Sequence, residues 1–228
     1  QTEGLPSHQF GIMLYLVVVL VLGCLSQEVL GCSCGRRHPQ SAYCSADFVI
    51  RGRFIGKTQY KTEEQGRVKY EIKTTKIFKA PQGMDDIQFL STPSMESMCG
   101  YEHVLSNKSQ AFLITGHAVN GNLVIDQCNF IVPWASLTTA QKRGFEEVYR
   151  KACSCNIVPC YGGSCSLESD SQCLWTDVLV HWQEPLNGSQ SKYMACVDQG
   201  NGLCTWESQK PSVIAARNKE AQSAATAQ

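Results

Sequence analysis

The most reactive side chains in this sequence are cysteines, and their first dense group is Cys32-Ser33-Cys34, followed by Cys44. Closely spaced thiols can ligate zinc, attack a substrate or pair as disulfides. CxxC pairs do not repeat in the chain, and its histidines lack the spacing of zinc fingers. No general base has a recognisable spacing to a thiol that it would activate. We therefore expect disulfides here rather than a structural zinc site or a catalytic cysteine.

An apolar run at 13–25 precedes this group. The run is shorter than the about 20 residues that a membrane span needs, and Val29 and Gly31 stand at positions −3 and −1 of a cut before Cys32. This pattern predicts a cleaved signal peptide at 1–31, with 1–12 as a possible upstream extension before an initiator Met13. A buried N-terminal helix, an uncleaved anchor and a bacterial lipoprotein box are the alternatives. The mature chain would be secreted, without a membrane span.

Cleavage would remove Cys24 and leave twelve of the 13 cysteines. An even number in a secreted chain predicts six disulfides formed in an oxidising compartment. Spacing alone leaves roughly ten thousand pairings open. The twelve are Cys32, Cys34, Cys44, Cys99, Cys128, Cys153, Cys155, Cys160, Cys165, Cys173, Cys196 and Cys204.

Charge gives little indication of a partner. Lysines plus arginines number 20, as do aspartates plus glutamates, so net charge does not favour a nucleic acid or an acidic partner. Arg36-Arg37 and the lysine-bearing run at 57–79 predict a local basic face. Such a face could contact a glycosaminoglycan or be an ordinary solvated strand surface.

Two segments, 47–55 and 68–78, alternate apolar and polar residues and predict half-buried strands joined by a hairpin loop at 58–66. Shorter strands are expected at 87–90, 111–115 and 122–125, the last after an Asn120-Gly121 hairpin turn. A helix is expected from 136 onward, because Thr138 and Gln141 form a capping-box pair and Phe145 begins an apolar face. Five strands followed by a helix predict a closed β-barrel of the OB-fold type.

Seven of the twelve retained cysteines fall between Cys153 and Cys204. This density predicts a small disulfide-rich C-terminal module, in which 174–179 could form a hairpin strand. The last segment, 209–228, has no core pattern and is expected to be a disordered tail. The tripeptides Asn107-Lys108-Ser109 and Asn187-Gly188-Ser189 are candidate N-glycosylation sites in polar loops.

Five ordered motifs resemble the tissue inhibitors of metalloproteinases over nearly all of 32–208. They are CSCGRRHPQSAYC at 32–44, TPSMESMCGY at 92–101, CNFIVPWASLTTAQKRGF at 128–145, CLWTD at 173–177 and CTWES at 204–208. The resemblance implies a mainly β fold with helices, with a netrin-like OB-fold inhibitory domain at 32–153 and a C-terminal domain at 154–208. Gly35-Arg36-Arg37 departs from the proline-containing segment usual in the family, which puts affinity and protease preference in question.

The resemblance also implies a disulfide pairing with three bridges in each domain. The implied pairs are Cys32–Cys99, Cys34–Cys128, Cys44–Cys153, Cys155–Cys204, Cys160–Cys165 and Cys173–Cys196. It further implies a secreted, extracellular inhibitor without enzymatic activity and without a cofactor of its own. Its partners would be matrix metalloproteinases and related zinc proteases in one-to-one complexes, and a latent gelatinase or a cell-surface receptor could bind the C-terminal domain.

By this resemblance the free amine and carbonyl oxygen of Cys32 would chelate the catalytic zinc of the protease. Ser33 would enter the S1′ pocket, while Cys34 and Gly35 continue along the cleft. Glu96, Ser97 and Met98 would form a second contact segment. The competing hypothesis keeps the netrin-like barrel but makes it an extracellular binding or signalling module without inhibitory activity.

Overall fold

The computed structural model describes residues 11–13, 15, 17, 19, 31–61 and 66–226. The chain forms two compact units, Gln1–Cys32 and Ser33–Gln228. Residues 11–13, 15, 17 and 19 are helical, and the rest of the predicted signal segment except Gly31 lies outside the described residues, as does Cys24. Among the residues that were described, no helix is both long and apolar enough to cross a membrane.

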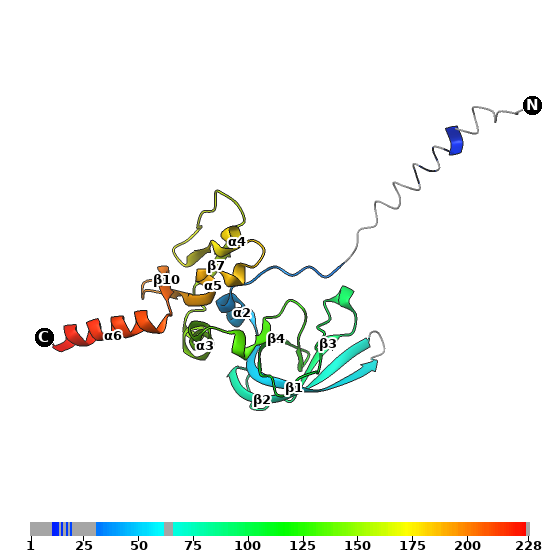
Figure 1. The fold of residues 1–228 in the computed structure, drawn as a ribbon, viewed down its shortest axis with the longest axis horizontal. Helices are drawn as coiled ribbons and strands as arrows, with labels where there is room; N and C mark the ends of the chain where they lie inside the picture. Colours follow the sequence, from blue (N-terminus) through cyan, green and yellow to red (C-terminus); the bar gives the residue numbers. More distant parts are fainter. Residues whose placement is uncertain are drawn as a thin grey trace, which may run out of the picture. The chain divides into compact units, whose positions relative to one another are not determined.

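The second unit is built on a ring of five strands, of which β1, β2, β3 and β4 are labelled in Figure 1. The order β1-β2-β3-β5-β4 closes through a further pairing of β1 with β4, and β6 is added beside β4. All neighbours are antiparallel except β3 and β5, which are parallel. The strands are β1 Phe48–Lys61, β2 Gly66–Lys79, β3 Phe89–Pro93, β4 Phe112–Val119, β5 Asn122–Val124 and β6 Ile131–Pro133. The expected OB-type barrel is confirmed.

The interior of the barrel is filled by apolar side chains, because its strands alternate apolar and polar residues as the sequence indicated. Phe48, Ile50 and Phe54 of β1 face the interior at 1% exposure or less, and in β2 buried residues alternate with exposed ones from Val68 to Lys73. The Asn120-Gly121 turn has positive φ at both residues, 51° and 78°, as a tight hairpin turn requires. The β1–β2 loop is shorter than expected, since the strands continue to Lys61 and resume at Gly66.

A second apolar layer covers the outside of β1 and β4. Val49 and Leu113 point away from the barrel and pack against helical segments and Ala195. These segments are α2 Pro39–Ser45, α3 Thr139–Arg143, a π-helical turn η3 Gly144–Val148 and a 3-10 turn η4 Tyr149–Lys151. The predicted capping box is present at the start of α3. Gly144, which weakens a helix by propensity, is explained by packing, because a Cβ there would lie 2.3 Å from the Tyr149 ring.

The C-terminal part of this unit consists of short elements. They are β7 Asn156–Pro159, β8 Gln172–Trp175, α4 Asp177–Val180, η5 Pro185–Asn187, α5 Ser189–Tyr193, β9 Met194–Asp198 and β10 Cys204–Ser208. The expectation of a hairpin strand at 174–179 is wrong: β8 ends at Trp175 and pairs in parallel with β7, and α4 follows. A parallel partner cannot come from a tight hairpin and needs a longer connection, so local alternation could not reveal it.

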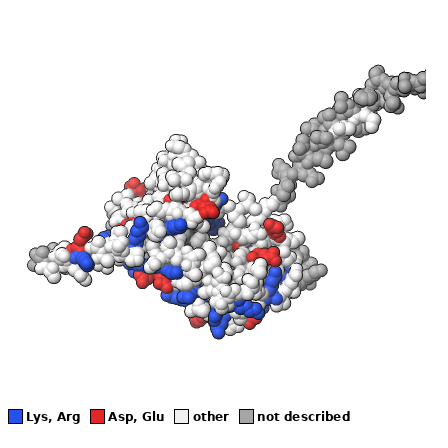
Figure 2. All heavy atoms as spheres, in the orientation of Figure 1, with Lys and Arg blue, Asp and Glu red and all other residues white. Residues whose placement is uncertain are grey.

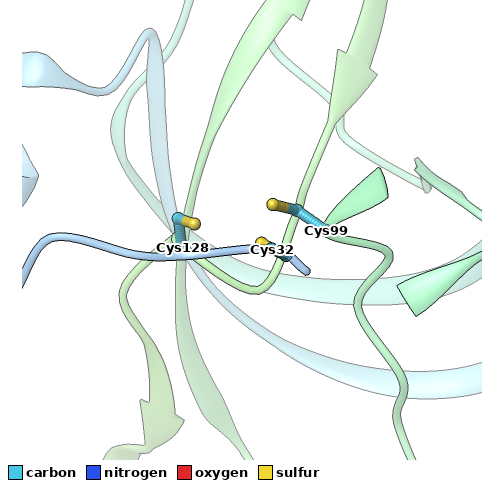
Figure 3. Close-up of side chains that lie close together, drawn as sticks. All are labelled: Cys32, Cys99 and Cys128. Atoms are coloured by element: carbon cyan, nitrogen blue, oxygen red, sulfur yellow. The ribbon is translucent and has the colours of Figure 1, made fainter. Parts of the chain in front are cut away.

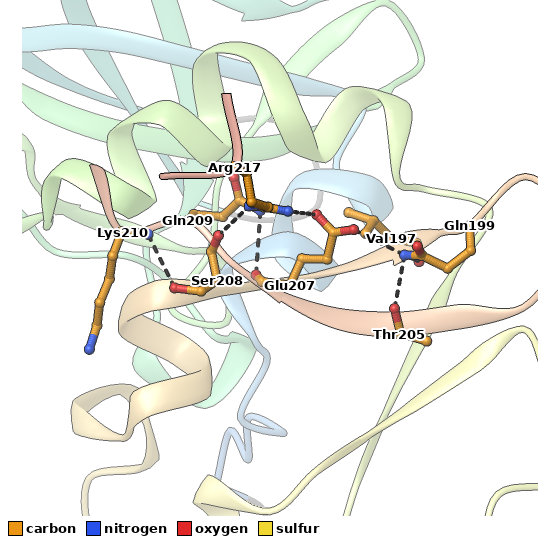
Figure 4. Close-up of polar contacts among 8 residues, drawn as sticks. All are labelled: Val197, Gln199, Thr205, Glu207, Ser208, Gln209, Lys210 and Arg217. Carbon is orange, nitrogen blue, oxygen red and sulfur yellow. Dashed lines mark hydrogen bonds and ion pairs between the residues drawn. The ribbon is translucent and has the colours of Figure 1, made fainter. Parts of the chain in front are cut away.

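The structure also differs from the expected disordered tail, because Pro211–Thr226 forms helix α6. Five of the residues of this segment are alanine, the strongest helix former, which favours a helix even though none of its residues is buried. Arg217 fastens the helix by donating to a Glu207 carboxylate oxygen at 2.6 Å and to the Ser208 carbonyl at 2.8 Å (Figure 4). On the face drawn in Figure 2, positive and negative side chains are interspersed.

Candidate functional site

The segment from Ser33 to Arg37 has no regular secondary structure, and all five of its residues are exposed. It is fixed at one end by the Cys34–Cys128 disulfide, whose Cα atoms are 5.0 Å apart. At the other end it runs directly into α2. A normally mobile piece of chain is therefore held at both ends, which lowers the entropy that a binding partner would have to remove.

His38 anchors the start of α2. Its Nδ1 accepts a hydrogen bond from the Gln40 amide, so Nε2 carries the hydrogen and donates to the Gln190 carbonyl at 3.1 Å. The ring is completely buried, 5.7 Å from the Trp175 ring and 5.2 Å from the Trp206 ring by their centroids. Burial lowers the pKa of His38 from 6.5 to about 4, although its bond to Gln190 acts in the opposite direction. The imidazole is thus neutral at physiological pH.

The second expected contact segment forms a tight 3-10 turn, η1 Glu96–Met98, in which Glu96 and Ser97 are exposed and Met98 is half-buried. The turn ends because Cys99 adopts the left-handed conformation, φ 59°, and its amide donates to the Glu96 carbonyl at 2.9 Å. The next residue is Gly100, and a Cβ at this position would lie 2.3 Å from the Pro93 carbonyl oxygen. Only glycine fits there without moving backbone.

Gln127 joins the two segments. Its backbone amide donates to the Cys99 carbonyl, and its side-chain amide donates to the Gly100 carbonyl, both at 2.9 Å. The next residue, Cys128, is bonded to Cys34. The 33–35 segment and the η1 turn are therefore connected through two successive residues.

Cys32 directly precedes the 33–35 segment. The Sγ atoms of Cys32, Cys99 and Cys128 lie within 4.8 Å of one another (Figure 3). All three are disulfide-bonded and so offer no thiolate to a metal, and the same holds for the grouped Cys155, Cys196 and Cys204.

The structure contains five of the disulfides that the resemblance implied. They are Cys34–Cys128, Cys44–Cys153, Cys155–Cys204, Cys160–Cys165 and Cys173–Cys196. Cys32 and Cys99 are also disulfide-bonded. All twelve cysteines that remain after the proposed cleavage are thus oxidised, as expected for an oxidising compartment.

A pocket of about 420 Å³ lies beside the exposed segment. Cys34, Gly35 and Arg36 line it together with the Cys128 turn and residues 183–187. The Arg36 guanidinium donates through Nη1 to the Gln183 carbonyl, which links the segment to the C-terminal part of the unit. The sequence did not indicate that residues 183–187 lie beside this segment, because the backbone carbonyl that Arg36 contacts leaves no residue-type signal.

Both candidate glycosylation sites are exposed. The Asn107 side-chain oxygen accepts from the amide and the hydroxyl of Ser109, at 3.1 Å and 2.6 Å. Asn187 ends η5, lines the pocket described above and donates to the Glu184 carboxylate. Glycan attachment at either asparagine stays a prediction.

The sequence profile described as tissue inhibitor of metalloproteinase matches residues 30–206. The chain belongs to the tissue inhibitor of metalloproteinase family. Metalloproteinase inhibitor 3 of Xenopus laevis is 39% identical over 188 residues, which cover 82% of this chain and 86% of that protein. Metalloproteinase inhibitor 2 of Bos taurus is 36% identical over 195 residues, with the same two coverages.

A third relative, metalloproteinase inhibitor 3 of Scyliorhinus torazame, is 37% identical over 182 residues, covering 80% of this chain and 83% of its own. Membership of the tissue inhibitor of metalloproteinase family points to an inhibitor and not to an enzyme. Within the family, the segments MESMCGY, PWASL and CTW resemble metalloproteinase inhibitor 1 in particular, and that finer assignment stays a prediction.

Proposed function

We propose that this chain is a secreted inhibitor of zinc metalloendopeptidases, including matrix metalloproteinases, and that it binds them one-to-one. Its family and the names of its relatives support the general activity. The mature protein begins at Cys32 after removal of 1–31, and its inhibitory domain spans 32–153. The metal in the complex is the zinc of the protease.

Cys32 binds that zinc through its backbone. A catalytic zinc has three protein ligands and one open position, which a small, well-aimed donor can take. The thiol of Cys32 is not available, since it is oxidised. The α-amine and the carbonyl oxygen of the same residue can close a five-membered ring on the metal. An α-amine has an ordinary pKa near 8, so it gives up its proton to bind far more readily than a lysine does.

The following residues occupy the substrate cleft. Ser33 enters the S1′ pocket, Cys34 and Gly35 continue in extended form, and Glu96, Ser97 and Met98 make the second contact. The observation that carries this proposal is the connection of these two exposed segments through Gln127 and the Cys34–Cys128 disulfide. A Cys32–Cys99 bridge, which we also propose, fixes the first residue itself. No peptide bond precedes Cys32, so the protease has nothing to cleave there.

The C-terminal module, 154–208, has an additional proposed role in contacting a latent gelatinase or a cell-surface receptor. The apolar side chains of Val180 and Trp182 support such a contact, since they are 69% and 70% exposed. Glycans at Asn107 and Asn187 belong to the same proposal of an extracellular protein.

The deciding experiment compares two forms of the folded, oxidised protein that differ by one residue. Protein beginning at Cys32 should inhibit a matrix metalloproteinase catalytic domain at near one-to-one stoichiometry. Protein with one alanine added before Cys32 should not inhibit, because its amine lies one residue away and the Cys32 nitrogen is an amide. Equal inhibition by both forms would exclude chelation by Cys32. Equal unfolding midpoints would show that the extension acts on the site and not on stability.

A further inference from the structure

Two arginines follow the part of the chain that we propose for the protease cleft. Arg36 and Arg37 are both exposed and stand two and three residues after Cys34. Arg36 donates through Nη1 to the Gln183 carbonyl, and Arg37 donates through Nη1 to the Ser45 hydroxyl at 3.1 Å. Each guanidinium has five N–H donors, so each has several left for a partner.

Their backbone is held firmly. Cys34 is bridged to Cys128 on one side, and on the other side the buried His38 and Pro39 begin α2. The two side chains are therefore presented from a fixed piece of chain, which reduces the entropy lost when they bind.

Neither arginine has a charge partner within the part of the chain that the structure describes. The ion pairs found there involve other residues. Glu184 lines the same pocket as Arg36, but its carboxylate accepts a hydrogen bond from Asn187. The contacts of both arginines are to a neutral carbonyl and a neutral hydroxyl, which leave the two positive charges uncompensated.

We propose that Arg36 and Arg37 select, among zinc proteases, those with carboxylates on the rim of the cleft beyond the S1′ pocket. This inference rests on the proposed function. A carboxylate accepts two parallel hydrogen bonds from one guanidinium, which adds directional recognition to the charge attraction. Exposed complementary charges mainly accelerate association and choose between partners. The effect should therefore be found in the association rate and should weaken in salt.

The experiment uses one matrix metalloproteinase catalytic domain in two forms. In the first, the cleft rim carries its aspartates and glutamates; in the second, they are replaced by asparagines and glutamines. Association rates with the Cys32-start protein are measured at about 50 mM and about 300 mM NaCl, where screening lengths differ more than twofold. We expect association with the acidic form to be about tenfold faster at low salt, with most of the preference lost at high salt.

Three variants of the inhibitor test whether Arg36 and Arg37 cause the preference for the acidic form. Arg36→Gln/Arg37→Gln should lose the preference for the acidic form, and Arg36→Lys/Arg37→Lys should keep most of its salt dependence. Arg150→Gln/Lys151→Gln removes the same charge from exposed positions in η4 and should behave as wild type. A preference that survives Arg36→Gln/Arg37→Gln overturns the inference. Equal rates for the two protease forms overturn it while leaving the proposed function intact, whereas inhibition of neither form overturns both.

Discussion

The side-chain amide of Gln40 and the backbone of Cys196 are hydrogen-bonded in both directions. Nε2 of Gln40 donates to the Cys196 carbonyl at 2.8 Å, and the Cys196 amide donates to Oε1 at 2.9 Å. The same Nε2 donates to the Ala152 carbonyl at 3.0 Å, and Gln40 is only 1% exposed. One polar side chain of α2 thus pairs with strand β9 as a neighbouring strand would. The exposed segment before α2 depends on this connection for its position.

Replacing Gln40 by leucine should destabilise the protein by about 3 kcal/mol, because buried amide and carbonyl groups lose their partners. The measurement is denaturant unfolding with the disulfides intact. Gln199→Ala is the matched control, since Gln199 is exposed and its amide bonds lie at the surface; a loss below about 1 kcal/mol is expected there. Similar losses in both variants would contradict a special role for Gln40.

Stability should fall as pH decreases from about 6.5 toward 4. The folded-state pKa of His38 is about 4, below the ordinary 6.5, because burial disfavours the charged ring and outweighs the attraction of Asp177. In that window the unfolded chain binds a proton that the folded chain does not, so the stabilisation present above pH 6.5 is lost on acidification. The difference between the folded and unfolded pKa of His38 corresponds to a loss of roughly 3 kcal/mol in the free energy of unfolding.

The contribution of His38 is isolated by comparing unfolding free energies at pH 7 and pH 4.5 with those of His38→Gln. The variant should be less stable at pH 7, since it loses ring packing against Trp175 and Trp206. Its unfolding free energy should also change less between the two pH values, because glutamine does not titrate. The other titrating groups are the same in both proteins. If the unfolding free energy of His38→Gln falls as much between pH 7 and pH 4.5 as that of the wild type, His38 is excluded as the source of the pH dependence.

Gly100→Ala should displace the η1 turn. The added Cβ would lie 2.3 Å from the Pro93 carbonyl oxygen and 2.8 Å from that of Met95, and neither backbone atom can rotate away. We expect a loss of roughly 1–3 kcal/mol in stability and weaker inhibition of a metalloproteinase, since Glu96 and Ser97 would move. Gly162→Ala has open space around the new Cβ and serves as the control. Equal inhibition by both variants would argue against a protease contact at η1.

The barrel could be predicted because its signals are local. Alternation along β1 and β2, the Asn120-Gly121 turn and the Thr138–Gln141 capping box each depend on neighbours in sequence, and each is present. Helix α2 was missed for the opposite reason. It has seven residues, and its buried Gln40 is satisfied by groups 112 and 156 positions away. No local pattern predicts that a glutamine there is interior.

The candidate site was predictable in its residues but not in its arrangement. Motif resemblance indicated Ser33 and the 96–98 segment, yet cysteine spacing alone left the pairing open. Backbone carbonyls of Cys99 and Gln183 make two of the decisive contacts, to Gln127 and Arg36. Every residue has such a carbonyl, so these contacts appear only once the chain is folded.

Two disulfides join the segment at 33–44 to cysteines far along the chain. Cys34 and Cys44 are bonded to cysteines 94 and 109 residues further along the chain. A ribosome releases the N-terminal part first, at about 5–20 residues per second, so residues 33–44 emerge several seconds before Cys128 and Cys153 exist. The segment at 33–44 is therefore synthesised before its partners and is among the last to be fixed. Oxidative folding, and not translation, sets the time at which this segment acquires its final form.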